Sequence, residues 1–215
     1  MLTAGELADA LPAAAVQEPA VVITFDDGFA QAVGEARGRL KEAGMHATFF
    51  CVAGHLGATS EWPGRRPDTP VRPLASVEEL AALARDGHEI GSHGWSHAAL
   101  DGETDLRREI LESKAALSTV AGCEVRTYAY PYGARPSTSA HALVRQTYAA
   151  AFGTRAGRAG TGSPRYELPR VDAHYLRDPR LLRRVVGGSL DAYLVARRFG
   201  SRARRAYRKD YVAAA

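Results

Sequence analysis

Short apolar runs and helical segments alternate along most of the chain. Each run is rich in β-branched or aromatic residues, and most are followed by a stretch whose apolar residues recur every three or four positions. The predicted strands are residues 21–25, 47–52, 89–92, 127–130, 150–153 and 168–173. The predicted helices are residues 30–43, 76–86, 101–121, 137–149 and 179–199. This alternation predicts an α/β fold with mostly parallel strands.

One long loop interrupts the alternation. Residues 54–73 are rich in Gly, Pro, Arg and Thr, and a loop of this length in a compact domain is often a lid or a binding edge. We find no internal repeat. The sequence therefore predicts one domain over residues 1–215, with a helical, basic C-terminal segment at 179–215.

The composition indicates a globular protein and leaves its cellular location open. The chain has 215 residues, 46% hydrophobic and 24% charged, as in ordinary globular proteins. No run approaches 18 apolar residues, so we expect no transmembrane helix. The N-terminus has no basic leader with an apolar core, which favours a cytoplasmic or peripheral membrane location, or the cell envelope if a leader was removed. Two cysteines, Cys51 and Cys123, predict neither a disulfide framework nor a cysteine metal site.

Positive charge is concentrated near the C-terminus. The segment from Arg197 to Lys209 holds seven basic residues and no acidic one, and without them the net charge of +4 becomes −3. This segment is either a solvated helix face or a contact for an anionic partner, such as a phospholipid surface or a polyanionic glycan. We find no nucleic-acid-binding motif and expect no nucleic-acid partner.

Asp26 and Asp27 directly follow the first predicted strand. Adjacent carboxylates repel each other, and their burial costs desolvation energy. One interpretation is an N-cap for the next helix, although two acids exceed what one cap needs. Alternatively, a cation neutralises one carboxylate while the other stays ionised as a base for a metal-bound water.

Two further polar clusters follow later strands. His93 and His97 are four residues apart, and two histidines with a carboxylate form a common set for a divalent cation with open positions. Pro131 and Gly133 indicate either a plain strand-ending turn or a rigid loop that presents a backbone N–H to an oxyanion. Since ligands bind beyond the carboxyl ends of parallel strands, the three clusters could share one pocket.

Together these clusters resemble the polysaccharide deacetylase family, the NodB-homology domain of carbohydrate esterase family four. "TFDDG" at 24–28, "SHGWSH" at 92–97 and "YPYG" at 130–133 are similar to its first three motifs. The resemblance covers about residues 20–175. It implies a distorted (β/α) barrel that hydrolyses N-acetyl groups, usually on a glycan that contains N-acetylglucosamine.

The resemblance also implies a role for each motif residue. Asp27, His93 and His97 would hold a divalent metal, most commonly zinc, with cobalt, nickel or manganese as alternatives. Asp26 would be the general base. The backbone N–H of Tyr132 would help to stabilise the oxyanion.

The chain departs from the family pattern at several positions. Ala129 stands where many members carry an arginine that contacts the catalytic aspartate, and Arg170 is our candidate to replace it, unless it forms a structural ion pair. His174, with Asp172 as an orienting partner, is the candidate general acid. The usual late tryptophan is not visible, and we favour Trp62 as a side chain that stacks on a sugar, with simple packing as the alternative.

The predicted function is therefore a metal-dependent N-deacetylase that acts on an amino-sugar glycan or glycoconjugate. Two alternatives stay open: an amide or ester hydrolase for another small molecule, and a catalytically silent glycan-binding domain. The intact motif aspartates and histidines argue against a silent domain.

Overall fold

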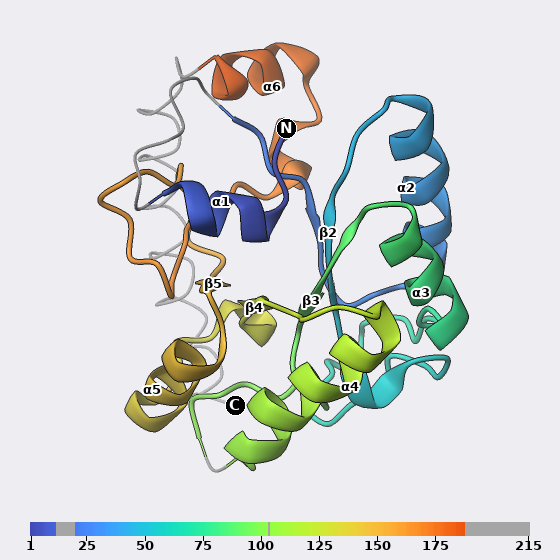
Figure 1. Cartoon of the computed structure of the whole chain (residues 1–215), viewed down its shortest axis with the longest axis vertical. Helices are drawn as coiled ribbons and strands as arrows, with labels where there is room; N and C mark the ends of the chain where they lie inside the picture. The colour runs from blue at the N-terminus through green and yellow to red at the C-terminus, as the bar shows by residue number, and fades with distance from the viewer. Residues whose placement is uncertain (12–19, 103, 188–215) are drawn as a thin grey trace.

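Five parallel strands form a single sheet whose spatial order follows the chain, β1-β2-β3-β4-β5. The computed structural model describes residues 1–11, 20–102 and 104–187. The strands are β1 (Thr24–Phe25), β2 (Thr48–Cys51), β3 (Glu89–Ser92), β4 (Thr127–Ala129) and β5 (Ala150–Phe152). The sheet curls into a half-barrel with helices around it (Figure 1), which confirms the predicted fold class.

Most helices lie between consecutive strands. The α-helices are α1 (Ala4–Ala10), α2 (Ala30–Glu42), α3 (Val77–Arg85), α4 (Ser113–Ala121), α5 (Thr138–Thr147) and α6 (Pro179–Val186). The 3-10 turns are η1 (Ala53–His55), η3 (Pro131–Gly133) and η4 (Ala173–Leu176), and η2 (Arg107–Glu112) is a π-helix. Ser76 and Glu79 form the capping box at the start of α3, as their spacing predicts.

Two predicted elements differ from the structure. The predicted helix at 101–121 is divided into η2 and α4, because the helical period alone does not distinguish a π-turn from an α-turn. The predicted strand at 168–173 is wrong: only Leu168 makes a bridge, to Phe152. The next residue is Pro169, which has no backbone N–H to continue the pairing.

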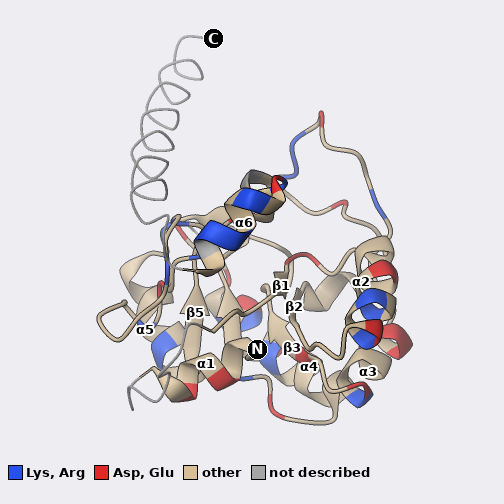
Figure 2. Cartoon of the chain, turned by 90° about the horizontal axis from the view of Figure 1, so that it is seen from above, with Lys and Arg blue, Asp and Glu red and all other residues tan. Residues whose placement is uncertain are grey.

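The C-terminal part of the chain is described only as far as residue 187. There α6 carries three exposed arginines, drawn blue in Figure 2: Arg180, Arg183 and Arg184. The basic segment from Arg197 to Lys209 lies outside the described residues, so its predicted contact with an anionic surface stays a prediction. Across the residues that are described, no helix is long and apolar enough to cross a membrane.

Apolar side chains cover both faces of the sheet. Phe49 and Cys51 of β2 belong to the larger core cluster, which includes side chains of α2, α3 and α4. Phe50 points to the other face and packs in a second cluster with Phe152 and the first helix, α1. All four residues of β2 are buried, as expected for the continuously apolar strand of a parallel sheet.

A polar cluster joins α1 to the amino ends of three strands. The Glu89 carboxylate accepts hydrogen bonds from Thr48 Oγ1 (2.9 Å), Thr127 Oγ1 (2.7 Å) and the backbone N–H of Gly5 (2.8 Å). Thr48 Oγ1 in turn accepts from the N–H of Ala4 at 2.8 Å. These bonds occupy the edge of the sheet where the strands begin. The polar residues that follow the strands lie at the opposite edge, where the strands end.

Replacement of Glu89 by Ala is expected to lower the free energy of unfolding by about 2 kcal/mol, because three donors lose their acceptor. Urea denaturation measures this loss. Glu42→Ala, at the exposed end of α2, is the matched control and should leave stability nearly unchanged. Equal stabilities of the two variants would contradict this account of the polar cluster.

Candidate active site

The carboxyl ends of β1, β3 and β4 bring the three polar clusters to one edge of the sheet. Asp26 and Asp27 follow β1, His93 follows β3, and Tyr132 lies in the turn after β4. Among the described residues, the only non-glycine positions with positive φ are Asp27 (71°), His97 (59°) and Tyr132 (57°). Such backbone strain often gathers at functional sites.

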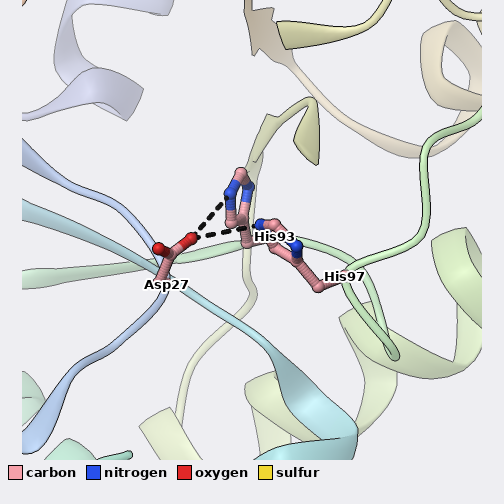
Figure 3. Close-up of side chains that lie close together, drawn as sticks. All are labelled: Asp27, His93 and His97. Atoms are coloured by element: carbon pink, nitrogen blue, oxygen red, sulfur yellow. Dashed lines mark ion pairs between the residues drawn. The ribbon is translucent and has the colours of Figure 1, made fainter. Parts of the chain in front are cut away.

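Asp27, His93 and His97 converge on one point (Figure 3). Asp27 Oδ1 lies 3.3 Å from His93 Nε2 and 3.2 Å from His97 Nε2. Ligands held tetrahedrally about 2.0–2.1 Å from one zinc ion are separated by about 3.3 Å. With their ligand atoms all within 4.8 Å of one another, the three side chains could hold one divalent cation.

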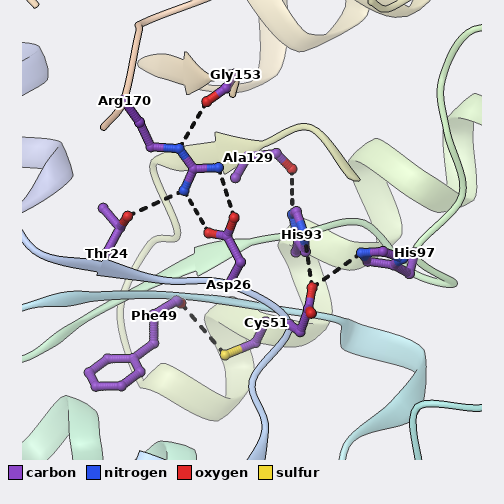
Figure 4. A network of polar contacts seen from close by, with 10 residues as sticks. Thr24, Asp26, Phe49, Cys51, His93, His97, Ala129, Gly153 and Arg170 are labelled. Carbon is purple, nitrogen blue, oxygen red and sulfur yellow. Dashed lines mark hydrogen bonds and ion pairs between the residues drawn. The ribbon is translucent and has the colours of Figure 1, made fainter. Parts of the chain in front are cut away.

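The two imidazoles are held in different ways. His93 Nδ1 donates a hydrogen bond to the carbonyl of Ala129 at 2.7 Å, which leaves Nε2 directed at Asp27 (Figure 4). His97 Nδ1 is buried and has no hydrogen-bond partner among the described residues. Its ring contacts those of Trp62 and Tyr132, with centroid separations of 4.3 and 4.4 Å.

Asp26 faces a guanidinium from a distant part of the chain. Arg170 donates two hydrogen bonds to its carboxylate, at 2.6 and 2.8 Å (Figure 4). The same side chain donates to Gly153 O at 2.9 Å and to Thr24 Oγ1 at 3.2 Å. Arg170 thus meets Asp26, while Ala129 stands at the position where an arginine is more usual.

Both aspartates favour the ionised form. Burial opposes ionisation of Asp26, but the charges of His93 and Arg170 outweigh it and hold the pKa of this carboxyl below its ordinary value. Burial also opposes ionisation of Asp27, whose pKa is nevertheless held well below the ordinary value by hydrogen bonds from His93 and His97. His93 thus favours both charges, while Arg170 acts on Asp26 and His97 binds Asp27.

The sequence profile of the polysaccharide deacetylases matches residues 13–151. The chain belongs to the polysaccharide deacetylase family. It is 27% identical over 156 residues to YxkH of Bacillus subtilis, which is named as a polysaccharide deacetylase. It is 30% identical over 116 residues to a peptidoglycan-N-acetylglucosamine deacetylase of Bacillus cereus.

The comparisons cover only part of these relatives. The matches span 72% of this chain but 51% of YxkH, and 53% of this chain but 36% of the Bacillus cereus protein. The chain thus corresponds to about half or less of their length. The structure of IcaB from Ammonifex degensii superposes with a TM-score of 0.67 at 22% identity, over 88% of this chain and 81% of that one, which shows the deacetylase fold.

Trp62 reaches this site from the long loop at 54–73. Its side chain is only 7% exposed and packs on His97, with Val52 and Leu74 in the same cluster. The structure therefore favours the packing alternative over a sugar-stacking role. Tyr132 is the more open aromatic side chain, with 48% of its surface exposed.

The predicted general acid lies in η4. His174 is exposed, and its backbone N–H donates to Asp172 Oδ1 at 2.8 Å. Asp172 thus caps the 3-10 turn through the main chain, and its role as orienting partner of the imidazole stays a prediction. The acid role of His174 stays a prediction.

Sequence reasoning missed Glu109, a buried residue of η2. Its carboxylate contacts the loop between His93 and His97. One signal was available: Glu109 lies on the inward face of the predicted helix, beside Ile110 and four residues before the buried Ser113. An acid on a buried helix face needs hydrogen-bond donors.

The Arg170–Asp26 contact predicts a measurable coupling. Arg170→Met should lower the free energy of unfolding by about 2 kcal/mol, because a charged acceptor loses two hydrogen bonds. A double-mutant cycle with Asp26→Asn should give a coupling of about 1–3 kcal/mol in chemical denaturation.

The exposed pair of Arg37 and Asp86, 2.6 Å apart, is the control, and a cycle on it should show clearly weaker coupling. Equal coupling in the two cycles would mean that Arg170 contributes no more to Asp26 than a surface ion pair does.

Proposed function

We propose that this chain is a metal-dependent N-deacetylase that hydrolyses N-acetyl groups of an amino-sugar glycan or glycoconjugate. The observation that carries the proposal is the convergence of Asp27, His93 and His97 beside the Arg170-bound carboxylate of Asp26. Membership of the polysaccharide deacetylase family supports it, as does a relative named for the N-acetylglucosamine of peptidoglycan.

Asp27, His93 and His97 would hold the metal. Two imidazoles and one carboxylate suit zinc, and also cobalt, nickel or manganese. A cation bound there polarises a water molecule and the carbonyl of the substrate. The hydrogen bond from His93 Nδ1 to Ala129 O keeps a proton on that nitrogen, so that Nε2, once it has released its own proton, would offer a lone pair to the metal.

Asp26 would be the general base. A base must be ionised before it accepts a proton, and the two hydrogen bonds from Arg170 favour the carboxylate form. They also fix the direction of the carboxylate, since a guanidinium bound through two nitrogens restricts rotation of its partner. Asp26 would take a proton from the attacking water, and a separate acid, for which His174 is the candidate, would protonate the leaving amine.

The turn after β4 would stabilise the oxyanion. Within η3 the N–H groups of Gly133 and Ala134 bond to Tyr130 O and Pro131 O. Tyr132 itself is in the left-handed conformation, with φ of 57° and ψ of 2°. The N–H of Tyr132 is the proposed donor to the developing oxyanion.

Chelation provides the direct test of metal dependence. We expect EDTA to abolish acetate release from N-acetylated oligosaccharides, and zinc or cobalt to restore it. Asp27→Ala should prevent this rescue, whereas Asp101→Ala, an exposed acid, should not. Activity that survives EDTA would refute metal dependence.

The same assays distinguish the two alternative functions. A protein that binds glycans and stays inactive with every metal would be the silent binding domain. Activity only on non-sugar amides or esters would favour the hydrolase for another small molecule.

Asp26→Asn is expected to lower kcat by about 10²–10⁴-fold, because the amide does not accept the proton of the water. Its affinity for zinc should stay within a few-fold of the original, since Asp26 is not one of the three converging ligands. Steady-state kinetics and calorimetric metal titration measure the two quantities. A variant that retains its kcat would exclude Asp26 as the base.

A further inference from the structure

The loop that joins the two proposed histidine ligands is bound along its length by one buried side chain. Glu109 is 3% exposed, and its carboxylate accepts from the N–H groups of Trp95 (2.8 Å) and Ser96 (3.1 Å). It also accepts from the Ser96 hydroxyl at 2.6 Å. Among the described residues, those that donate to the Glu109 carboxylate thus lie between His93 and His97.

The loop and the carboxylate approach each other closely because of a glycine. Gly94 has φ of +85°, and a Cβ there would lie 2.7 Å from Glu109 Oε2. Any larger residue would displace the carboxylate from the N–H groups that it binds. The main chain at Gly94 and the Glu109 carboxylate are therefore in close contact.

A second hydrogen-bond network holds Glu109 itself. Its helical turn, η2, is a π-helix in which the N–H of Ser113 bonds to Arg108 O, five residues earlier. The Ser113 hydroxyl donates to Glu109 O at 2.6 Å, and the Tyr148 hydroxyl donates to Ile110 O at 2.8 Å. Carbonyl groups of the widened turn are thus satisfied, and single π-turns of this kind often occur at functional sites.

We propose that Glu109 is a positioning residue for the metal site. Its carboxylate fixes the main chain between His93 and His97, and thereby sets the separation and direction of the two imidazoles before a metal binds. The inference rests on the proposed function, because it assumes that these histidines hold a metal.

A glutamine at position 109 distinguishes positioning from mere packing. Glutamine has nearly the same volume as glutamate, but its amide NH₂ cannot accept the hydrogen bonds that a carboxylate oxygen accepts. Glu109→Gln should therefore weaken zinc binding by about tenfold or more, the usual range for residues that orient metal ligands. With saturating metal, kcat should fall while KM changes little.

Metal titration with a competing chelator measures the affinity for zinc. The titration is made at a temperature well below the unfolding midpoint of the metal-free variant, so that the variant is folded throughout. The absorption spectrum of the cobalt form should change in Glu109→Gln, because the spectrum reports ligand geometry, which a loss of stability alone would not alter. Glu112→Gln is the control: this acid is exposed on the same helical turn and should match the original protein in affinity and spectrum.

Ser96→Ala keeps the test decisive if Glu109→Gln does not fold. It removes only the hydroxyl donor and should weaken zinc binding by about threefold or more. Unchanged affinity and cobalt spectrum in folded Glu109→Gln, or in Ser96→Ala if the first variant is unfolded, would overturn the inference. An original protein that binds no divalent metal would overturn the proposed function, and this inference with it.

Discussion

Asp26 and Asp27 stand side by side at the end of β1, where burial and mutual repulsion both oppose their ionisation. Each carboxylate has its own positive or donor partner. Arg170 binds Asp26 through two hydrogen bonds, and the two histidines converge on Asp27. The rest of the site follows from this requirement, since the partners must come from other strands and must be held firmly.

The sheet separates the polar groups that support the fold from those proposed to act on a substrate. At the amino ends of the strands, Glu89 binds two threonines and the first helix. At the carboxyl ends, the aspartates, the histidines and the turn after β4 gather. A parallel sheet makes this separation possible, because all of its strands exit at the same edge.

The proposed base and the loop of the proposed metal ligands are supported from distant parts of the chain. The loop at 54–73 brings Trp62 against His97, and the π-turn η2 brings Glu109 against the loop between the histidines. The segment after the Leu168 bridge supplies Arg170. Such supports restrict the motion of the side chains that they contact, which is what a preorganised site requires.

The sequence by itself determined the alternation of strands and helices, the parallel α/β class and the positions of the motif residues. These features depend on the order of neighbouring residues in the sequence. The spacing of apolar residues and the polar residues at strand ends are visible within a few positions. It was less reliable at residues 168–173, where a proline ended an apolar run after a single bridge.

Only the tertiary structure decided which groups surround the aspartates and histidines. Arg170 meets Asp26 across 144 residues, and Trp62 proved to be a buried neighbour of His97 rather than an open sugar platform. Glu109 was missed because it lies in a π-turn. The regular spacing of an α-helix does not reveal the register of such a turn. Contacts of this kind depend on how the curled sheet brings distant segments together, and no local pattern in the sequence records that.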